Sequence, residues 1–314
     1  MATYLITGGA GFIGSNIVGE LVRKGESVRV LDNFSTGKRE NLLPFNGRIE
    51  IIEGSLTDME TVKEAMGGID YVLHEGALPS VPRSVEQPIN SNDVNVGGTL
   101  NILVAARDEG VKRVVLASSS SVYGDTEVMP KVETMRPAPL SPYAVSKLTG
   151  ELYARVFSQL YGLQTVVLRY FNVFGPRQNP DSQYSAVIPK FINAMIHGKR
   201  PTIFGDGLQS RDFSYVENVV DANLLSATAP PTNGEVLNIA CQESHTLLDL
   251  VRVLNDLLGK HIEPEFKPTR QADVRHSLAD ISLAREVIGY KPKVRWEEGL
   301  QKTLVWYQQE WQRI

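Results

Sequence analysis

The first half of this 314-residue chain alternates between short apolar runs and longer stretches with helical periodicity. Residues 3–7 read TYLIT, and the stretch that starts at residue 12 places Ile13, Ile17 and Leu21 on one helical face. The cycle continues with strands expected near residues 27–32, 49–54, 70–76, 113–120 and 164–172, and helices near residues 58–68, 91–110 and 141–162. Strand alternating with helix predicts an α/β fold, in which a doubly wound, mostly parallel sheet carries helices on both faces.

The rhythm loosens beyond about residue 173, where Pro and Gly interrupt shorter elements. We expect residues 1–172 to form the main part of the larger domain, and residues 173–314 to form mainly a smaller C-terminal α/β lobe that faces the substrate. Some segments of the second half are expected to return to the first domain. The helices expected in this half lie near residues 185–198, 217–228, 246–258 and 296–311.

Composition excludes several classes of protein. With 42% hydrophobic and 22% charged residues, the chain has the composition of a soluble globular protein. Its net charge of −4 does not indicate a surface that binds nucleic acid. The sequence has no apolar run of about 18 residues and no signal-peptide pattern at its start, so we expect a cytoplasmic protein without a membrane anchor. The single cysteine, Cys241, and five scattered histidines predict neither a disulfide framework nor a metal site.

A glycine-rich turn joins the first expected strand to the first expected helix. Gly8, Gly11 and Gly14 have the spacing at which missing side chains let backbone amides approach a pyrophosphate. An ordinary strand-to-helix turn is the alternative, but the next strand ends in Asp32, about 20 residues further on. A carboxylate there can accept hydrogen bonds from an adenosine ribose and repels a 2′-phosphate. The pattern therefore predicts a Rossmann-type domain that binds NAD rather than NADP.

Tyr143 and Lys147 are candidates for acid–base chemistry. They lie four residues apart in the segment SPYAVSK, so a helix brings both side chains to one face. A nearby ammonium stabilises a phenolate, which makes proton abstraction from a hydroxyl feasible. Taken alone, the pair could be a surface Tyr and Lys. The run of serines at residues 118–121 follows a strand, where hydroxyls point into the ligand crevice of an open α/β sheet or simply cap a loop.

These features fall in one order on one sheet, and at this point the chain resembles the extended short-chain dehydrogenase/reductase family, within it the nucleotide-sugar 4-epimerases. The resemblance covers almost the whole length. It rests on the segments TGGAGFIG, LDN, DVNVGGTLN, SSSSVYG, SPYAVSK, RYFNVFGPRQ, FGDGLQSRDFSYV and RQADVRHSLAD.

The resemblance implies roles for individual residues. Tyr143 is expected to be the base, Lys147 to anchor the nicotinamide ribose and lower the pKa of Tyr143, and Ser119 to hydrogen-bond the sugar O4. The residues implied in cofactor binding are Gly8, Gly11, Phe12, Ile13, Gly14, Asp32, Asn33, Ser55, Leu56, Gly76, Ala77, Asn95, Tyr143, Lys147 and Tyr170. Ser55 replaces a usual carboxylate and Gly76 a commoner alanine, and we expect both to tune NAD affinity.

The same resemblance implies a site for a UDP-sugar. Asn172, Arg211 and Arg270 are expected to contact the diphosphate, Asp273 the nucleoside ribose, and Phe204 to stack on uracil. The full set implied in substrate binding is Ser80, Val81, Ser119, Ser120, Tyr143, Asn172, Ala186, Val187, Phe204, Arg211, Arg270, Asp273 and Ser277.

The serines beside the implied catalytic hydroxyl indicate the reaction. The resembling dehydratases and decarboxylases carry acidic residues there, whereas this chain has Ser120 and Ser121. A 4-keto intermediate without a second acid or base can only turn over and take its hydride back, so C4 epimerisation with regeneration of NAD is expected. Small residues at Ser277 and Ala186 leave room for an N-acetyl group, which favours UDP-GlcNAc/UDP-GalNAc beside UDP-Glc/UDP-Gal.

Other readings stay open. UDP-glucuronate 4-epimerases also carry a serine run, and Arg83 lies in a segment whose reach toward the sugar is unknown from sequence. A non-catalytic dinucleotide sensor and a net NAD-dependent dehydrogenase are further alternatives. The resembling enzymes pair two helices per subunit, and residues 91–109 and 143–161 match those helices, so we expect a homodimer built through a four-helix bundle.

Overall fold

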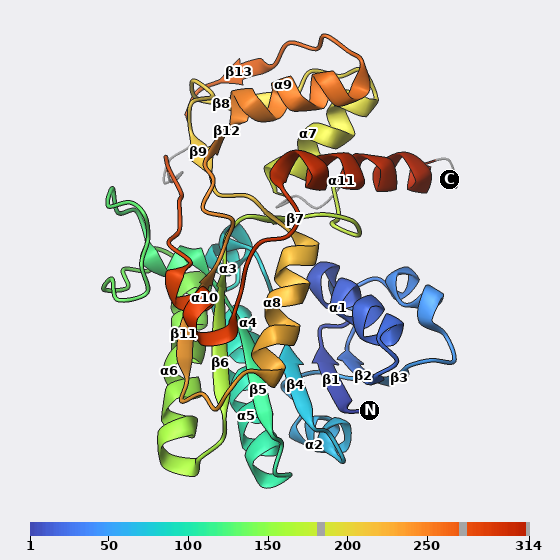
Figure 1. The fold of residues 1–314 in the computed structure, drawn as a ribbon, viewed down its shortest axis with the longest axis vertical. Helices are drawn as coiled ribbons and strands as arrows, with labels where there is room; N and C mark the ends of the chain where they lie inside the picture. Colours follow the sequence, from blue (N-terminus) through green and yellow to red (C-terminus); the bar gives the residue numbers. More distant parts are fainter. Residues whose placement is uncertain (181–185, 270–274, 312–314) are drawn as a thin grey trace.

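The computed structural model describes residues 1–180, 186–269 and 275–311. Its centre is a seven-stranded parallel sheet in the order β11-β6-β5-β4-β1-β2-β3 (Figure 1). The strands of this sheet are β1 (Thr3–Thr7), β2 (Ser27–Asp32), β3 (Glu50–Glu53), β4 (Tyr71–His74), β5 (Arg113–Ser119), β6 (Thr165–Tyr170) and β11 (Glu235–Ile239). This arrangement confirms the expected doubly wound, Rossmann-type fold.

Helices cover both faces of the sheet. The helices of the first half are α1 (Phe12–Arg23), α2 (Met59–Met66), α3 (Val81–Glu86), α4 (Pro88–Asn92), α5 (Gly98–Asp108) and α6 (Pro142–Tyr161), with 3-10 turns at Arg39–Asn41, Leu43–Phe45 and Ser120–Tyr123. Neighbouring residues of β1 show how the two faces divide. Ile6 packs into the core shared with α1, whereas Leu5 packs into the core shared with α2, α5 and α6. A strand buried on both sides explains why these segments read as continuous apolar runs.

One long helix expected near residues 91–110 is divided in the structure. The chain forms α4, then a π-helical turn at Asp93–Gly97, and then α5. Asn95 lies in the π-helical turn and its side chain bonds both the amide and the carbonyl of Leu78, at 2.7 and 3.2 Å. The wider turn therefore places a buried polar side chain against the segment that follows β4, in the manner of π-bulges at functional sites.

The second half contributes both to the main sheet and to a separate lobe (Figure 1). Strand β11 pairs with β6, and α8 (Val216–Thr228) packs beside α1 on the same face of the sheet. The sequence did not predict this strand. The other helices of this half are α7 (Val187–Ile196), α9 (Leu247–Leu258), α10 (Ser282–Ile288) and α11 (Trp296–Trp311).

Three two-stranded pieces complete the lobe. They pair β7 (Val173–Phe174) with β10 (Ser214–Tyr215), β8 (Thr202–Phe204) with β13 (Glu265–Lys267), and β9 (Ser210–Arg211) with β12 (His245–Thr246). Helices α7, α9 and α11 pack together above the carboxyl ends of the central strands (Figure 1). Because ligands of open α/β sheets bind at those carboxyl ends, the lobe closes over the expected site. Across the described residues, no helix is both long and apolar enough to cross a membrane.

Candidate active site

The turn between β1 and α1 is held by close contacts that only glycine permits. Gly8 has a φ of +67°, and a Cβ there would lie 2.7 Å from the Cα of Gly76 in the segment after β4. A Cβ on Gly14 would lie 2.2 Å from the carbonyl oxygen of Gly8. Helix α1 begins at Phe12, and within the described chain no side chain caps it. Its first amides therefore stay available at the positive end of the helix dipole, as binding of a pyrophosphate requires.

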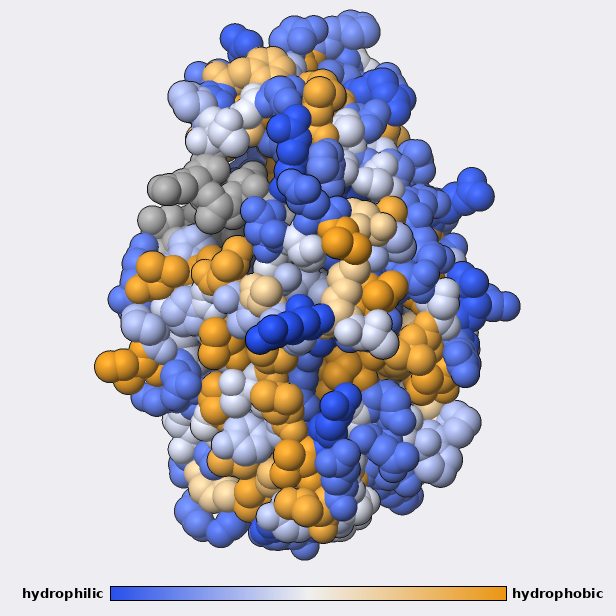
Figure 2. All heavy atoms as spheres, turned by 90° about the vertical axis from the view of Figure 1, so that its left-hand side faces the viewer, coloured by the Kyte–Doolittle hydropathy of each residue, from blue (hydrophilic) through white to orange (hydrophobic). Residues whose placement is uncertain are grey.

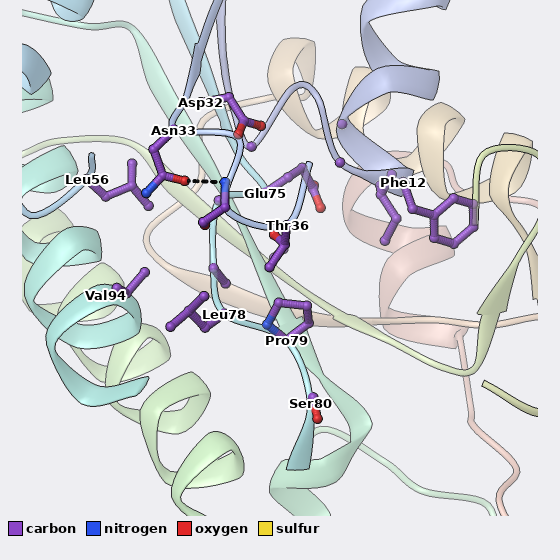
Figure 3. Close-up of a pocket in the computed structure, with 18 of the residues that line it drawn as sticks. Phe12, Asp32, Asn33, Thr36, Leu56, Glu75, Leu78, Pro79, Ser80 and Val94 are labelled. Carbon is purple, nitrogen blue, oxygen red and sulfur yellow. Dashed lines mark hydrogen bonds between the residues drawn. The ribbon is translucent and has the colours of Figure 1, made fainter. Parts of the chain in front are cut away.

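A cavity of about 750 Å³ runs along the carboxyl ends of β1, β2, β4 and β5. Figure 3 shows Asp32 and Asn33 at one end of this cavity, and Leu78, Pro79 and Ser80 toward the other. The glycine turn lines its floor. Its position between β1 and β4, where the strand order reverses, is the switch point at which Rossmann folds bind dinucleotides.

Asp32 occupies the end of β2, and its carboxylate organises the loops around it. One oxygen accepts a hydrogen bond from the amide of Ala10 at 2.9 Å, and the other accepts from the amide of Phe34 at 2.8 Å. Burial raises the pKa of Asp32, and these two backbone bonds oppose that rise. Each oxygen keeps a further lone pair, so Asp32 can still accept bonds from a ribose. The residues at this end fit the adenosine half of NAD.

The segment after β4 packs tightly against the loop after β3. A Cβ on Gly76 would lie 2.9 Å from the Cδ1 of Leu56 and 3.0 Å from the Oγ1 of Thr7. Leu56 and Gly76 both line the cavity. The room that a methyl group would need at residue 76 is therefore filled by the side chains of Leu56 and Thr7.

Tyr143 and Lys147 lie at the other end of the cavity, one turn apart on α6. Ser141 caps this helix, and Ser84 of α3 accepts a hydrogen bond from the amide of Tyr143 at 3.0 Å. The ammonium of Lys147 lies 6.0 Å from the ring centroid of Tyr143 and donates to the carbonyl of Ala117 at 2.9 Å. The helix start is thus fixed from two sides, which sets the position of the phenol.

Desolvation dominates the proton chemistry at this end. It raises the pKa of Tyr143 to about 12, while a hydrogen bond with Ser119 lowers it and the charge of Glu75 raises it further. Desolvation also lowers the pKa of Lys147, and the charges of Glu75 and Glu151 oppose that change. In the protein alone the phenol of Tyr143 is therefore protonated at neutral pH, and a cation bound beside it would lower its pKa.

Glu75 is a wall residue of the cavity that the sequence analysis did not single out. It follows β4 directly, and its carboxylate accepts a hydrogen bond from the hydroxyl of Tyr170 at 2.6 Å. The side chain of Asn223 in turn donates to that hydroxyl at 2.8 Å. Desolvation raises the pKa of Glu75 to about 7, although the bond from Tyr170 and the charge of Lys147 oppose that rise.

A second cavity, of about 280 Å³, is lined by residues of the smaller lobe. Ala186 lines both cavities, so the two spaces adjoin at the N-terminal end of α7. The other residues that line the second cavity are Asn172, Val173, Phe174, Val187, Ile188, Thr202, Phe204, Gln209, Arg211, Phe213 and Leu247. An apolar wall with a few polar groups suits a flat heterocycle joined to charged oxygens.

Asn172 and Ser277 meet beside this second cavity. Asn172 has a φ of +38°, a conformation that Asn tolerates better than most residues. Its amide donates to the carbonyl of Asp212 at 3.0 Å and to the hydroxyl of Ser277 at 3.4 Å. Ser277 is 8% exposed, so its short side chain faces this interior corner rather than solvent.

Residues 4–240 match the NAD dependent epimerase/dehydratase family. The chain belongs to this family. A UDP-glucose 4-epimerase of Mycolicibacterium smegmatis is 38% identical over 307 residues, which cover 96% of this chain and 97% of the relative. The similarity therefore extends over almost the full length of both chains.

Two solved structures of the family extend the comparison. The UDP-N-acetylglucosamine 4-epimerase of Methanobrevibacter ruminantium M1, in complex with UDP-N-acetylmuramic acid, has a TM-score of 0.94 and 42% identity and covers 98% of this chain and 99% of its own. A UDP-glucuronic acid 4-epimerase of Bacillus cereus, in complex with UDP-glucuronic acid and NAD, has a TM-score of 0.89 and 32% identity and covers 98% and 99%. The epimerase family thus includes close relatives named for three different sugars.

The implied cofactor residues of this NAD-dependent family member gather in one place. The first cavity is lined by Gly8, Gly11, Phe12, Ile13, Gly14, Asp32, Asn33, Ser55, Leu56, Gly76, Ala77, Tyr143, Lys147 and Tyr170. Asn95 is different, because it lies buried behind the wall and bonds the backbone of Leu78 and the hydroxyl of Ser146. It can act on a ligand only through the segment that it holds.

The implied substrate residues divide between the two cavities. Ser80 lines the first, Ala186 lines both, and Asn172, Val187, Phe204 and Arg211 line the second. Ser119 contacts the site through Tyr143, whereas Val81, Ser120 and Ser277 line neither cavity in the described structure. Val81 instead begins α3 with 42% of its surface exposed. Arg270 and Asp273 lie outside the described residues.

Several cavity residues of this family member were missed by the sequence analysis. Arg177, Gln178 and Asn179 line the first cavity beside α1, although they follow β7 in the chain. Arg177 and Gln178 end the segment RYFNVFGPRQ, of which only Tyr170 and Asn172 were chosen, and Asn179 follows it directly. Arg83 also lines this cavity. Its reach was left open from the sequence, because a helix position does not show how far a long side chain extends.

Proposed function

We propose that this protein interconverts UDP-hexoses at sugar carbon 4 through a transient 4-keto sugar. The observation that carries the proposal is the junction of the two cavities at Ala186. One cavity holds the glycine turn, Asp32 and the Tyr143–Lys147 pair, and the other holds Phe204 and Arg211. A dinucleotide in the first and a nucleotide in the second would bring a sugar to Tyr143. The 4-epimerase names of the relatives support the same reaction.

The residues of the chain divide the chemistry among them. NAD, held by the glycine turn and Asp32, would supply reversible hydride transfer at sugar carbon 4 with no net oxidation. Tyr143 takes the proton of the O4 hydroxyl and gives it back, Ser119 holds that oxygen, and Lys147 stabilises the phenolate. Because Ser120 and Ser121 supply no acid or base for elimination, turning of the sugar followed by return of the hydride gives the inverted centre.

The second lobe provides the diphosphate and uracil contacts in this proposal. Arg211 lines the second cavity, and its guanidinium donates to the carbonyls of Ser210 at 2.9 Å and Arg275 at 3.1 Å. These bonds hold the side chain in place. A prepositioned guanidinium suits the paired oxygens of a diphosphate, and the ring of Phe204 suits stacking on uracil. Asn172 supplies an amide at the same wall.

We propose that an N-acetylated sugar is accepted, because the groups at the expected sugar position are small. Ser277 lies against Asn172, which lines the second cavity, and Ala186 lines the junction, so neither side chain is large enough to obstruct an acetamido group at C2. A bulky residue at position 277 would remove that room. The relative named for UDP-N-acetylglucosamine supports this choice.

UDP-glucuronate is the second candidate substrate. The observation that favours it is Arg83, whose side chain lines the first cavity near Ser80 and could meet a C6 carboxylate. A UDP-glucuronate 4-epimerase of Thermodesulfobacterium geofontis is 34% identical over 316 residues. A cation at this position would give a uronate an advantage over a neutral hexose.

One experiment separates these candidates. Purified protein is incubated without added NAD with UDP-GlcNAc, UDP-Glc or UDP-GlcA, and the products are resolved by chromatography. Formation of UDP-GalNAc supports the N-acetyl assignment, and UDP-Gal alone supports epimerisation without it. Formation of UDP-GalA alone supports the assignment of UDP-glucuronate as the substrate. In a parallel incubation with added NAD, accumulation of NADH in solution would instead indicate a net dehydrogenase. No reaction with any sugar contradicts the proposal.

We further propose a homodimer that pairs α5 and α6 with the same helices of a second copy. Helix α6 carries a stripe of exposed apolar side chains at helical spacing, made of Val145, Leu152, Val156 and Leu160. Figure 2 shows apolar side chains gathered on the lower half of the face that turns toward the viewer. A stripe of this kind on a 20-residue helix supports helix-to-helix pairing, since large apolar patches mark interaction sites.

A further inference from the structure

Glu75 has no part in the chemistry described above, yet it lies in the wall of the first cavity beside the groups that perform it. Its position at the carboxyl end of β4 is fixed by the backbone, because its amide donates to the carbonyl of Thr7 at 3.2 Å. Its carboxylate is fixed by the bond from Tyr170, which Asn223 holds from the other side. Contacts with β1, β6 and α8 thus hold this half-buried carboxylate in a defined position.

The groups around Glu75 come from four elements. Helix α6 contributes Lys147 and Tyr143, β6 contributes Tyr170, and α8 contributes the neutral amide of Asn223. On its own strand, His74 is held between the hydroxyls of Thr7 and Thr99, at 2.7 and 2.9 Å. Burial lowers the pKa of His74 to about 3, so this ring is neutral. Lys147 is therefore the cation among these groups, and Glu75 is the acid that faces it.

Glu151 is the other acid that acts on Lys147, but it is committed elsewhere. Its carboxylate accepts a bond from Ser118 at 2.6 Å and two bonds from the guanidinium of Arg169 at 2.9 and 2.7 Å. The ion pair with Arg169 offsets much of the negative charge of Glu151. The charge balance at the catalytic end of the cavity is thus left mainly to Glu75 and Lys147.

We propose that Glu75 is a positioning residue whose negative charge keeps Lys147 protonated and sets the pH range in which Tyr143 works. The inference rests on the proposed function, since it assigns Tyr143 and Lys147 their roles. The same charge would favour the cationic oxidised nicotinamide over the neutral reduced one, because the reacting ring must lie at Tyr143. Glu75 would then help the cofactor return to its oxidised form after each turnover.

The variant Glu75→Gln tests the charge alone. Glutamine keeps the shape and still offers an oxygen to the hydroxyl of Tyr170, but it removes the negative charge. Loss of a negative charge lowers the pKa of every neighbour, so both limbs of the plot of kcat/KM against pH should move to lower pH, by roughly one unit. Tyr143 must lose its proton on the acid limb, and Lys147 must keep its proton on the alkaline limb.

The matched control is Tyr170→Phe, which removes the hydrogen bond and leaves the charge. If Glu75 only supports the local structure, both variants should lose turnover while their pH limits stay where the unmodified enzyme has them. That result overturns the proposal. A shift of both limbs in Glu75→Gln that is absent in Tyr170→Phe supports it. Thermal unfolding of both variants shows that the fold is retained.

The cofactor gives a readout that does not depend on turnover. Bound nucleotide is released from purified Glu75→Gln and from the unmodified enzyme, and the reduced fraction is measured by absorbance at the NADH band. A larger reduced fraction in the variant supports the role of the charge, and an equal fraction contradicts it. If the unmodified enzyme epimerises none of the UDP-sugars, the proposed function fails, while this comparison still decides whether Glu75 favours the oxidised cofactor.

Discussion

Lys147 lies one helical turn from Tyr143 but does not contact its hydroxyl, because its ammonium donates to the carbonyl of Ala117 at 2.9 Å and stands 6.0 Å from the phenol ring centroid. The ammonium therefore forms no hydrogen bond with the phenol. Burial raises the pKa of Tyr143 to about 12, so the proposed base needs a further positive charge, which a bound oxidised cofactor would supply. In the proposed mechanism the cofactor therefore binds before the proton is transferred.

Removing the phenol should separate binding from chemistry. Tyr143→Phe removes the group that takes the O4 proton, so kcat for epimerisation should fall roughly a hundredfold to ten-thousandfold. Bound NAD, measured after denaturation of the purified protein, should stay at the level of the unmodified enzyme, because the glycine turn and Asp32 are unchanged. Unchanged turnover in this variant would sink the proposed mechanism.

The charge of Lys147 should set the acid limit of activity. Tyr143 works deprotonated in the proposed mechanism, so activity is lost as the pH falls through the pKa that its phenol has in the enzyme with bound cofactor. Lys147→Met removes a cation that favours the phenolate, and the acid limb of the kcat profile should therefore move to higher pH. Lys147→Arg keeps the charge and is the control. Its limb should stay close to that of the unmodified enzyme even where turnover falls, and equal shifts in both variants would contradict this account.

Asp32 should matter for both cofactor retention and stability. Asp32→Ala leaves the buried amides of Ala10 and Phe34 without their acceptor, which should lower the free energy of unfolding by about 1–3 kcal/mol. It also removes the expected ribose contact, so purified protein should carry less NAD. Ser55→Ala, at another residue of the same cavity, is the control and should change both quantities much less. Denaturant melts and released nucleotide measure the two effects, and full NAD content in Asp32→Ala would refute the ribose assignment.

The size of residue 277 should decide between sugars. Ser277→Tyr fills the interior corner beside Asn172, so kcat/KM for UDP-GlcNAc should fall at least tenfold, while kcat/KM for UDP-Glc should change little. The ratio of the two values is the measurement, because it cancels any general loss of activity. A variant that keeps the full ratio shows that this corner does not hold the acetamido group.

The apolar stripe on α6 should be needed for the dimer. Leu152→Glu combined with Leu160→Glu places two charges on side chains that are 57% and 70% exposed in the single chain, and should give a monomer in analytical ultracentrifugation. Leu43→Glu changes a leucine that is 58% exposed on the 3-10 turn Leu43–Phe45, away from α6, and is the control. A monomer already in the unmodified protein, or a dimer in all variants, would contradict the proposed interface.

The main sheet could be predicted from sequence because its strands are buried on both faces and read as local apolar runs. Strand β11 could not, since its five residues lie among the prolines and glycines of the second half. The π-helical turn at Asp93–Gly97 also escaped prediction. Apolar periodicity shows that a helix is present, but it does not show where one turn widens by a residue.

The site could be predicted as far as its residues belong to recognisable segments. Glu75 escaped because its importance comes from a partner 95 residues away, Tyr170, and from a helix in between. Val81 was placed in the substrate set although it starts an exposed helix, since residues next to a cavity segment are not separated by sequence from residues that line it. Long-range pairings of this kind arise only when the sheet is assembled.

Because Leu56 and Gly76 are in contact, the size of the side chain at one position limits the size that fits at the other. An alanine at residue 76 would need a smaller side chain at residue 56, and a larger one at residue 56 would need the glycine kept. Their effects on stability and NAD affinity should therefore be non-additive, so that Gly76→Ala is less harmful with Leu56→Ala than alone, although its contact with Thr7 remains. The departure from the commoner alanine is then a local compensation, in which one loop gives up a methyl group so that its neighbour can be larger.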